Sequence, residues 1–290
     1  MVGRKRIAAA PISWGICEVP DWGFQMASER VLAEMASLGI NATEFGPEGF
    51  LPDQPSARAS MLAYYGLTAV GGFLPVVLHD GDSDPLPIAE RFLETCVSTG
   101  ASVMVLAADS GMAGYEVRPT IDDTGWTTLL ANLELMVQVA SDCGITAVLH
   151  PHLGTIVEGP TEVERVLAGS AIGICLDTGH LLAGGTDPVW LTREHSERIA
   201  HVHLKDVDAG LASELRDGRV GYNDAVDRGM YRPLGQGDID IRTIVSLLEN
   251  RGYDGWYVLE QDVMLSDAPA GEGPILDVRD SLNYLRKILT

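Results

Sequence analysis

The stretch IGICLDTGHLLAGGTDPVWLTREHSERIAHVHLKD (172–206) indicates the fold of this 290-residue chain. It contains two short apolar runs, 172–177 and 199–204, and each run ends among acids and histidines. A buried strand normally ends in a turn residue, whereas these two end in groups that bind metals and transfer protons. The stretch therefore predicts two neighbouring strands whose ends carry chemistry.

Similar runs recur along the whole chain and give eight candidate strands. They lie at 6–13, 40–45, 67–74, 101–108, 145–150, 172–177, 199–204 and 256–261. Amphipathic helical patterns alternate with them, at 27–39, 85–100, 124–144, 239–252 and 275–289. Because parallel strands need a crossover connection, repeated strand–helix units predict a parallel sheet. Eight units predict an α/β fold, a closed (β/α)8 TIM barrel that occupies residues 1–290 as one domain.

Two other architectures fit the sequence less well. A doubly wound nucleotide-binding fold would need a glycine-rich phosphate turn after the first strand, and APISWGICEVP (10–20) has no GxGxxG pattern. A solenoid would need a repeat of about 20–50 residues, and the sequence has none.

The longest interruption, 207–238, separates the seventh strand from the seventh helix and is rich in Gly, Asp and Arg. A loop this long is usually functional, so we expect a lid or binding loop at the active-site face, with a tolerated surface insertion as the alternative. The residues in it that we expect to decide substrate choice are Arg216, Arg219, Tyr222 and Arg232.

Composition narrows the class of partner. Twenty basic residues against 41 acidic ones give a formal charge of −21, which disfavours nucleic acid and anionic membrane surfaces. No run approaches the ~20 apolar residues of a membrane span, and the apolar run after the basic start at 1–5 is too short for a signal peptide. The four cysteines form no CxxC pair, which indicates a reduced, cytoplasmic protein. The oligomeric state stays open.

The strand ends of a barrel converge on one mouth, so the residues there are candidates for a site. They are Glu44, His79, His150, His152, Asp177, His180, His201, His203, Lys205, Asp206, Glu260 and Asp262. Converging acids and imidazoles would be costly to bury without a cation or shared protons. Mixed nitrogen and oxygen donors suit a divalent Mn, Co, Fe, Zn or Mg ion, and manganese is the favoured expectation.

Strand alternation selects among the histidines, because residues i and i+2 share a face. His201 and His203 share one, and the later residue lies nearer the mouth. His203 is therefore the better ligand, and His201 is expected to fill a barrel layer. For His150 and His152 the choice stays open, because Pro151 bends the chain between them.

Several motifs resemble those of the xylose-isomerase-like TIM-barrel superfamily, and within it the inosose dehydratases (2-keto-myo-inositol dehydratases). They are HPHLGT (150–155), DTGH (177–180), HVHLKD (201–206), PLGQGDID (233–240) and GWYVLEQD (255–262), and the resemblance covers nearly the whole chain. It implies a metal set of His150, Asp177, His203 and Glu260. The superfamily's usual first ligand is glutamate, so His150 is a departure, which argues against a two-glutamate epimerase and agrees with the dehydratases.

The resemblance also implies roles around the metal. Lys205 and His180 would face the substrate, and either would protonate the departing hydroxyl. Glu260, His150 or His152 would remove the proton next to the ketone, with Glu44 behind them. Glu44 and Trp14 would line the pocket from the opposite side, although Trp14 fits equally well as a packed aromatic residue.

The implied function is metal-dependent dehydration of a small keto-cyclitol, such as 2-keto-myo-inositol, through an enediolate. The alternatives are a keto-polyol isomerase or epimerase, in which the proton returns to another carbon, and a non-catalytic sugar-binding barrel. A metal-dependent endonuclease on the same barrel is disfavoured by the charge of −21.

Overall fold

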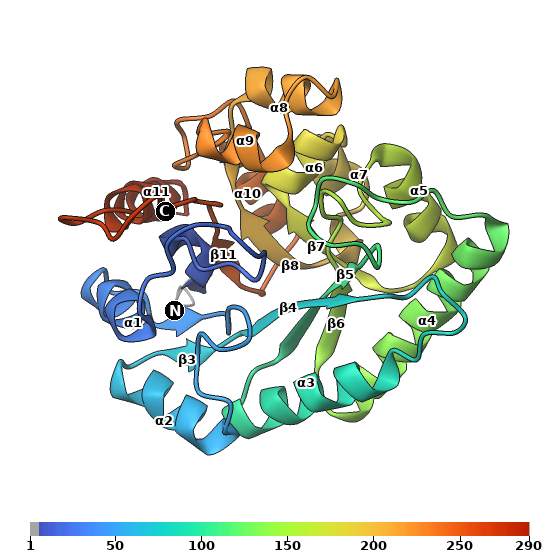
Figure 1. The fold of residues 1–290 in the computed structure, drawn as a ribbon, viewed down its shortest axis with the longest axis horizontal. Helices are drawn as coiled ribbons and strands as arrows, with labels where there is room; N and C mark the ends of the chain where they lie inside the picture. The colour runs from blue at the N-terminus through green and yellow to red at the C-terminus, as the bar shows by residue number, and fades with distance from the viewer. Residues whose placement is uncertain (1–5, 290) are drawn as a thin grey trace.

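The computed structural model describes residues 6–289, so the basic start at 1–5 and Thr290 lie outside it. Figure 1 shows strands gathered at the centre and helices around them. The strands of the main sheet are β1 (Ile7–Ala9), β2 (Ala42–Thr43), β3 (Thr68–Ala69), β4 (Gly71–Val76), β5 (Val103–Ala108), β6 (Thr146–Leu149), β7 (Gly173–Asp177), β8 (Ile199–Leu204) and β11 (Tyr257–Leu259). All neighbouring strands pair in parallel, which confirms the expected TIM barrel.

The barrel closes at Val70. The strand order is β3-β2-β1-β11-β8-β7-β6-β5-β4, and its two edge strands are consecutive in the chain on either side of Val70. The Val70 amide donates to the Thr43 carbonyl at 2.9 Å, and the Val70 carbonyl accepts from the Val103 amide at 3.1 Å. The predicted strand 67–74 is thus one barrel strand, divided into β3 and β4, and it joins the two edges of the sheet.

Gly71 at this seam gives the first testable prediction. A β-carbon there would lie 1.9 Å from the carbonyl oxygen of Val103. We expect Gly71→Ala to lower the free energy of unfolding by about 3 kcal/mol, the upper end of overpacking effects, as measured by urea denaturation. Gly81→Ala is the control, because a β-carbon at Gly81 meets nothing within 4 Å. Equal midpoints for the two variants would contradict this view of the seam.

The helices around the sheet are α1 (Ser28–Ser37), α2 (Pro55–Tyr64), α3 (Leu86–Thr99), α4 (Asp123–Asp142), α5 (Pro160–Gly169), α6 (Thr178–Gly184), α7 (Pro188–Glu194), α10 (Ile241–Asn250) and α11 (Ile275–Ile288). Their apolar faces form one core cluster with the outer side of the sheet, and small residues such as Ala8, Val105 and Cys175 form a second cluster. None of the helices in residues 6–289 is long and apolar enough to cross a membrane. All four cysteines are free.

The segment 207–238 is an ordered excursion and not an irregular loop. It contains α8 (Ala209–Arg216) and α9 (Tyr222–Asp227), and β9 (Asp206–Val207) pairs with β10 (Tyr231–Arg232) in antiparallel. Asp206 fixes the return of the chain, because its carboxylate accepts from the amides of Gly235, Gly237 and Ile239. Figure 1 shows α8 and α9, in orange, beside α6.

Candidate active site

Four predicted metal ligands lie together at the ends of four successive staves. His150 follows β6, Asp177 ends β7, His203 lies in β8 and Glu260 follows β11, and one donor atom from each lies within 4.8 Å of the others. His152 is not part of this group, although the sequence left the choice between it and His150 open. In the strand ladder Asp177 pairs with His203, directly above Cys175 and His201. Cys175 and His201 therefore lie in a buried layer inside the barrel, and the donors Asp177 and His203 lie one layer nearer its mouth.

Asp177 has a second role at its strand end. Its Oδ1 accepts from the His180 amide at 2.7 Å and so caps α6, while its Oδ2 lies 3.2 Å from His150 Nε2. The side chain is fully buried. The motif DTGH thus ends a strand, starts a helix and leaves one oxygen facing the cluster.

Glu44 sets the orientation of His203. Its Oε1 lies 2.8 Å from His201 Nε2 and 3.0 Å from His203 Nε2. Burial alone would raise the pKa of Glu44, but the two histidines lower it well below its usual range, so the carboxylate accepts from both Nε2–H groups. His203 Nδ1 then faces Glu260 Oε2 at 2.9 Å and has no hydrogen-bond partner among the described residues. A carboxylate behind a metal-binding imidazole is a common arrangement, so this donor set fits a divalent cation.

This arrangement predicts that Glu44 strengthens metal binding by orienting His203, although Glu44 is not one of the four predicted ligands. Glu44→Leu removes the acceptor that fixes His203, so we expect metal affinity to fall about 10–100-fold in a chelator competition. Glu29→Leu, in the first turn of α1, is the control. An unchanged metal affinity in Glu44→Leu would show that the carboxylate has no such role.

Lys205 lies next to the group of four predicted metal ligands, and its ammonium pairs with three carboxylates. Its Nζ lies 2.6 Å from Asp262 Oδ1, 2.9 Å from Glu260 Oε1 and 3.4 Å from Asp177 Oδ2. Burial alone would lower the pKa of Lys205, but these three acids raise it well above its usual value. The lysine is therefore a charged ammonium inside the barrel mouth.

A cavity of about 550 Å³ opens at these residues, which we call the catalytic cavity. Glu44, His150, His152, Lys205 and Glu260 line it. His180, which the resemblance placed against the substrate, does not: it is buried, with its ring 3.8 Å from that of His152. Trp14 is fully buried and donates to Glu34 at 2.8 Å, so it packs against α1 and does not line the cavity either. His79 also lies outside the lining.

His152 has a defined tautomer. Its Nδ1 lies 2.7 Å from the Leu153 carbonyl oxygen, which can only accept, so Nδ1 carries the proton and Nε2 keeps a lone pair. Burial and then the neighbouring His180 lower the pKa of His152 well below its usual value. His152 is therefore a neutral imidazole at the cavity wall.

Two tyrosines that the strand pattern did not select complete the site. Tyr222 of α9 donates to Asp262 Oδ2 at 2.6 Å, and Tyr115 packs its ring 4.5 Å from that of His152. Tyr222 is the only one of the four excursion residues expected to decide substrate choice that lines the catalytic cavity. No periodicity identifies such residues, because they come from connections and not from strands.

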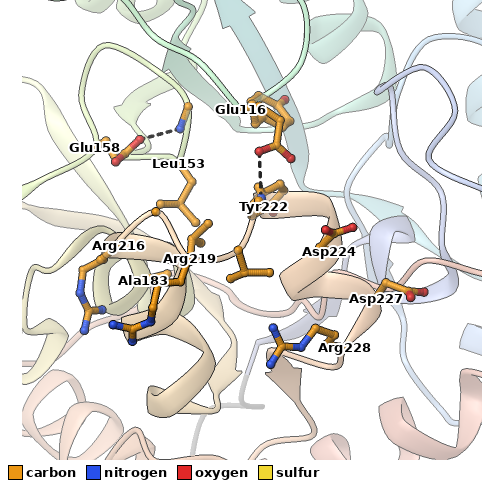
Figure 2. Close-up of a pocket in the computed structure, with 16 residues that line it drawn as sticks. Glu116, Leu153, Glu158, Ala183, Arg216, Arg219, Tyr222, Asp224, Asp227 and Arg228 are labelled. Carbon is orange, nitrogen blue, oxygen red and sulfur yellow. Dashed lines mark hydrogen bonds between the residues drawn. The ribbon is translucent and has the colours of Figure 1, made fainter.

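A second cavity, of about 760 Å³, adjoins the first and shares Tyr115 and Tyr222 with it. Figure 2 shows Glu116 at the start of α9, where its carboxylate accepts from the Tyr222 amide at 3.0 Å and so holds that helix in place. Arg216 and Arg219 line this second cavity, whereas Arg232 pairs with Asp208 at 3.3 Å and lines neither.

Comparison with protein families identifies one matching model. The family described as xylose isomerase-like TIM barrel matches residues 32–288. An inosose dehydratase of Geobacillus kaustophilus (strain HTA426) is 32% identical over 301 residues, which cover 99% of this chain and 96% of the relative. The rhizopine catabolism protein MocC of Rhizobium meliloti is 32% identical and covers 89% of this chain and 81% of its own length.

Solved structures share the fold at low identity. The crystal structure of IOLI protein with a binding zinc atom has a TM-score of 0.70 at 13% identity and covers 98% of both chains. The probable 3-DHS dehydratase AsbF of Bacillus anthracis has a TM-score of 0.69 at 12% identity and covers 97% of this chain and 98% of its own.

Proposed function

The chain belongs to the xylose isomerase-like TIM barrel family, and we propose that it is a metal-dependent hydro-lyase that dehydrates a keto-cyclitol such as 2-keto-myo-inositol. The observation that carries the proposal is the group of His150, Asp177, His203 and Glu260 beside Lys205. His150, Glu260 and Lys205 line the catalytic cavity. The relatives named inosose dehydratase, which align with nearly the whole chain, support the same reaction.

The four ligands we propose offer two imidazole nitrogens and two carboxylate oxygens. This mixture suits manganese, cobalt, iron, zinc or magnesium, and manganese is our choice among them. A divalent ion held by these residues would supply a Lewis acid that polarises the ketone and stabilises negative charge on its oxygen. The chain's own residues then have to remove one proton and supply another.

We assign the proton removal to His152. It lines the catalytic cavity, and its neutral ring keeps the Nε2 lone pair. A positioned neutral imidazole accepts a proton through its free nitrogen, as a general base does. Glu260, the other candidate, is already held by Lys205 Nζ at 2.9 Å and faces His203 Nδ1 at 2.9 Å, so His152 is the better choice.

We assign protonation of the leaving group to Lys205. The electron pair of the broken C–H bond first becomes part of the enediolate. As the ketone re-forms, a pair of electrons makes the carbon–carbon double bond to the neighbouring carbon, whose C–O bond breaks, and the departing oxygen takes a proton from Lys205 to leave as water. A departing hydroxide is a far stronger base than an amine, so this transfer is downhill. A placed acid typically contributes about 10²–10⁴-fold to the rate. His180 is the weaker candidate, because it does not line the cavity.

The substrate we propose is neutral, which suits a chain with a charge of −21. The four free, widely spaced cysteines favour the reducing cytoplasm as the place of the reaction.

The test is incubation of the Mn²⁺-loaded protein with 2-keto-myo-inositol, with chelator-treated protein as the control. We expect water loss and the ultraviolet absorbance of a conjugated enone or dione product. Recovery of a keto-polyol of changed configuration, without absorbance, would replace the proposal with an isomerase or epimerase. Binding without turnover of any keto-polyol would indicate a binding protein.

A further inference from the structure

We propose that the catalytic cavity contains a second subsite, between the segment after β2 and helix α3, that takes a neutral, hydroxyl-rich ring attached to the reacting ring. This inference rests on the proposed function and refines its substrate class, from a single keto-cyclitol ring to a two-ring keto-polyol such as a glycosyl keto-cyclitol.

The first support is the extent of the cavity. His150, Lys205 and Glu260 line it at the catalytic end, and Arg91, Phe92 and Thr95 of α3 line the same cavity. Cavities of about 300–1,000 Å³ usually hold drug-sized ligands, so 550 Å³ is more than one six-membered ring requires. The space beyond the catalytic residues is what we call the outer lobe; its lining residues are Glu48, Asp53, Arg58, Arg91, Phe92 and Thr95.

The second support is the mixture of side chains at the outer lobe. Phe45 lies between the Arg58 guanidinium, 5.3 Å from its ring centre, and the Phe92 ring at 5.9 Å. A sugar ring has an apolar C–H face and a polar hydroxyl edge, so it matches a wall that combines aromatic faces with hydrogen-bonding groups.

The third support is that the two guanidiniums keep free donors. Within residues 6–289, the Arg58 guanidinium donates only through its Nε, to the Pro52 carbonyl at 3.1 Å, and the Arg91 side chain has neither a hydrogen bond nor an ion pair. A guanidinium has five N–H donors in a fixed fork, so both side chains offer several to ligand oxygens.

The fourth support is the charge balance, which favours a neutral ligand. The outer lobe has two guanidiniums, Arg58 and Arg91, and two carboxylates, Glu48 and Asp53. The carboxylates accept hydrogen bonds from hydroxyls and the guanidiniums donate to them. A phosphate or carboxylate on the ligand would have to approach both acids.

The test compares three probes that lack the reactive ketone, by calorimetry on the Mn²⁺-loaded protein. They are myo-inositol, galactosyl-myo-inositol and myo-inositol 1-phosphate. We expect the two-ring probe to bind roughly tenfold tighter than myo-inositol. Thr95→Trp, which fills the outer lobe, and Arg91→Ala, which removes donors without adding bulk, should both reduce this advantage. Glu94→Trp, at an exposed neighbour on α3, is the control and should retain it.

Each outcome decides the proposal. Equal binding of one-ring and two-ring probes, or an advantage that survives both variants, would overturn it, and tighter binding of the phosphate would overturn the neutral class. Turnover of 2-keto-myo-inositol and of a glycosyl keto-inositol by the wild type is measured on the same sample. A tight two-ring probe with turnover of neither ketone would refute the dehydratase and leave the subsite standing.

Discussion

Replacing Asp177 with asparagine is expected to release the metal and to abolish dehydration. The side chain is fully buried, and its Oδ2 lies 3.2 Å from His150 Nε2 and 3.4 Å from Lys205 Nζ. An amide oxygen still caps α6 through the His180 amide, so the fold should persist while the negative charge is lost. We expect kcat/KM to fall by on the order of 10³-fold, the scale seen when one strong electrostatic contact to a transition state is removed.

Elemental analysis of the purified variant and the ultraviolet assay provide the measurement. Asp187→Asn is the matched control, because Asp187 also caps a helix, through the Val189 amide at 2.8 Å, but does not belong to the group of four proposed metal ligands. It should keep full metal content and turnover. If Asp177→Asn retained both, the proposed metal site would be wrong, whatever the fold.

Replacing Lys205 with methionine is expected to damage stability and catalysis together. The ammonium is the counter-charge of three buried carboxylates, and removing one partner of a buried ion pair typically costs about 3–5 kcal/mol. Urea denaturation of the metal-free protein should show a loss of that size. Turnover at full metal loading should fall by about 10²–10⁴-fold, because the leaving hydroxyl loses its acid.

A double variant separates the two effects. Asp262 has Lys205 and Tyr222 as its two nearest partners, at 2.6 Å each. Lys205→Met with Asp262→Asn therefore removes one of the three carboxylate charges that the lysine had balanced. We expect part of the stability to return while turnover stays low. Recovered turnover in the double variant would exclude Lys205 as the acid, and unchanged stability in the single variant would mean that the ion pairs contribute little.

The strand positions were predictable because a buried parallel strand corresponds to a short run of consecutive apolar residues. Each of the eight predicted runs contains a strand of the barrel, although 6–13 yields only Ile7–Ala9, since Pro11 begins a short 3-10 helix, Pro11–Trp14. Strand alternation alone selected His203 over His201. The choice of Asp177 and Glu260 as its partners came from the family resemblance, and the structure brings the three donors together.

The short helices were not predictable in the same way. Helices α6, α7, α8 and α9 have 7, 7, 8 and 6 residues, too few for a clear amphipathic period. Helices α2 and α5 were also missed, although each has 10 residues, as many as the predicted α1. Helix α9 is held by Glu116, 106 residues earlier in the chain, so its local sequence does not contain the reason for its stability. For this reason the sequence predicted a loop at 207–238, where the structure has two helices.

By itself, the sequence determined the barrel, the staves that carry the donors and the side of each strand on which they lie, because strand geometry ties these features to neighbouring residues. Only the tertiary structure decided that His150 and not His152 joins the group, that Glu44 holds His201 and His203, and that Tyr222 reaches Asp262. These contacts join residues 27 to 159 positions apart. Their existence depends on how the closed barrel and its connections pack, and no local pattern in the chain records that.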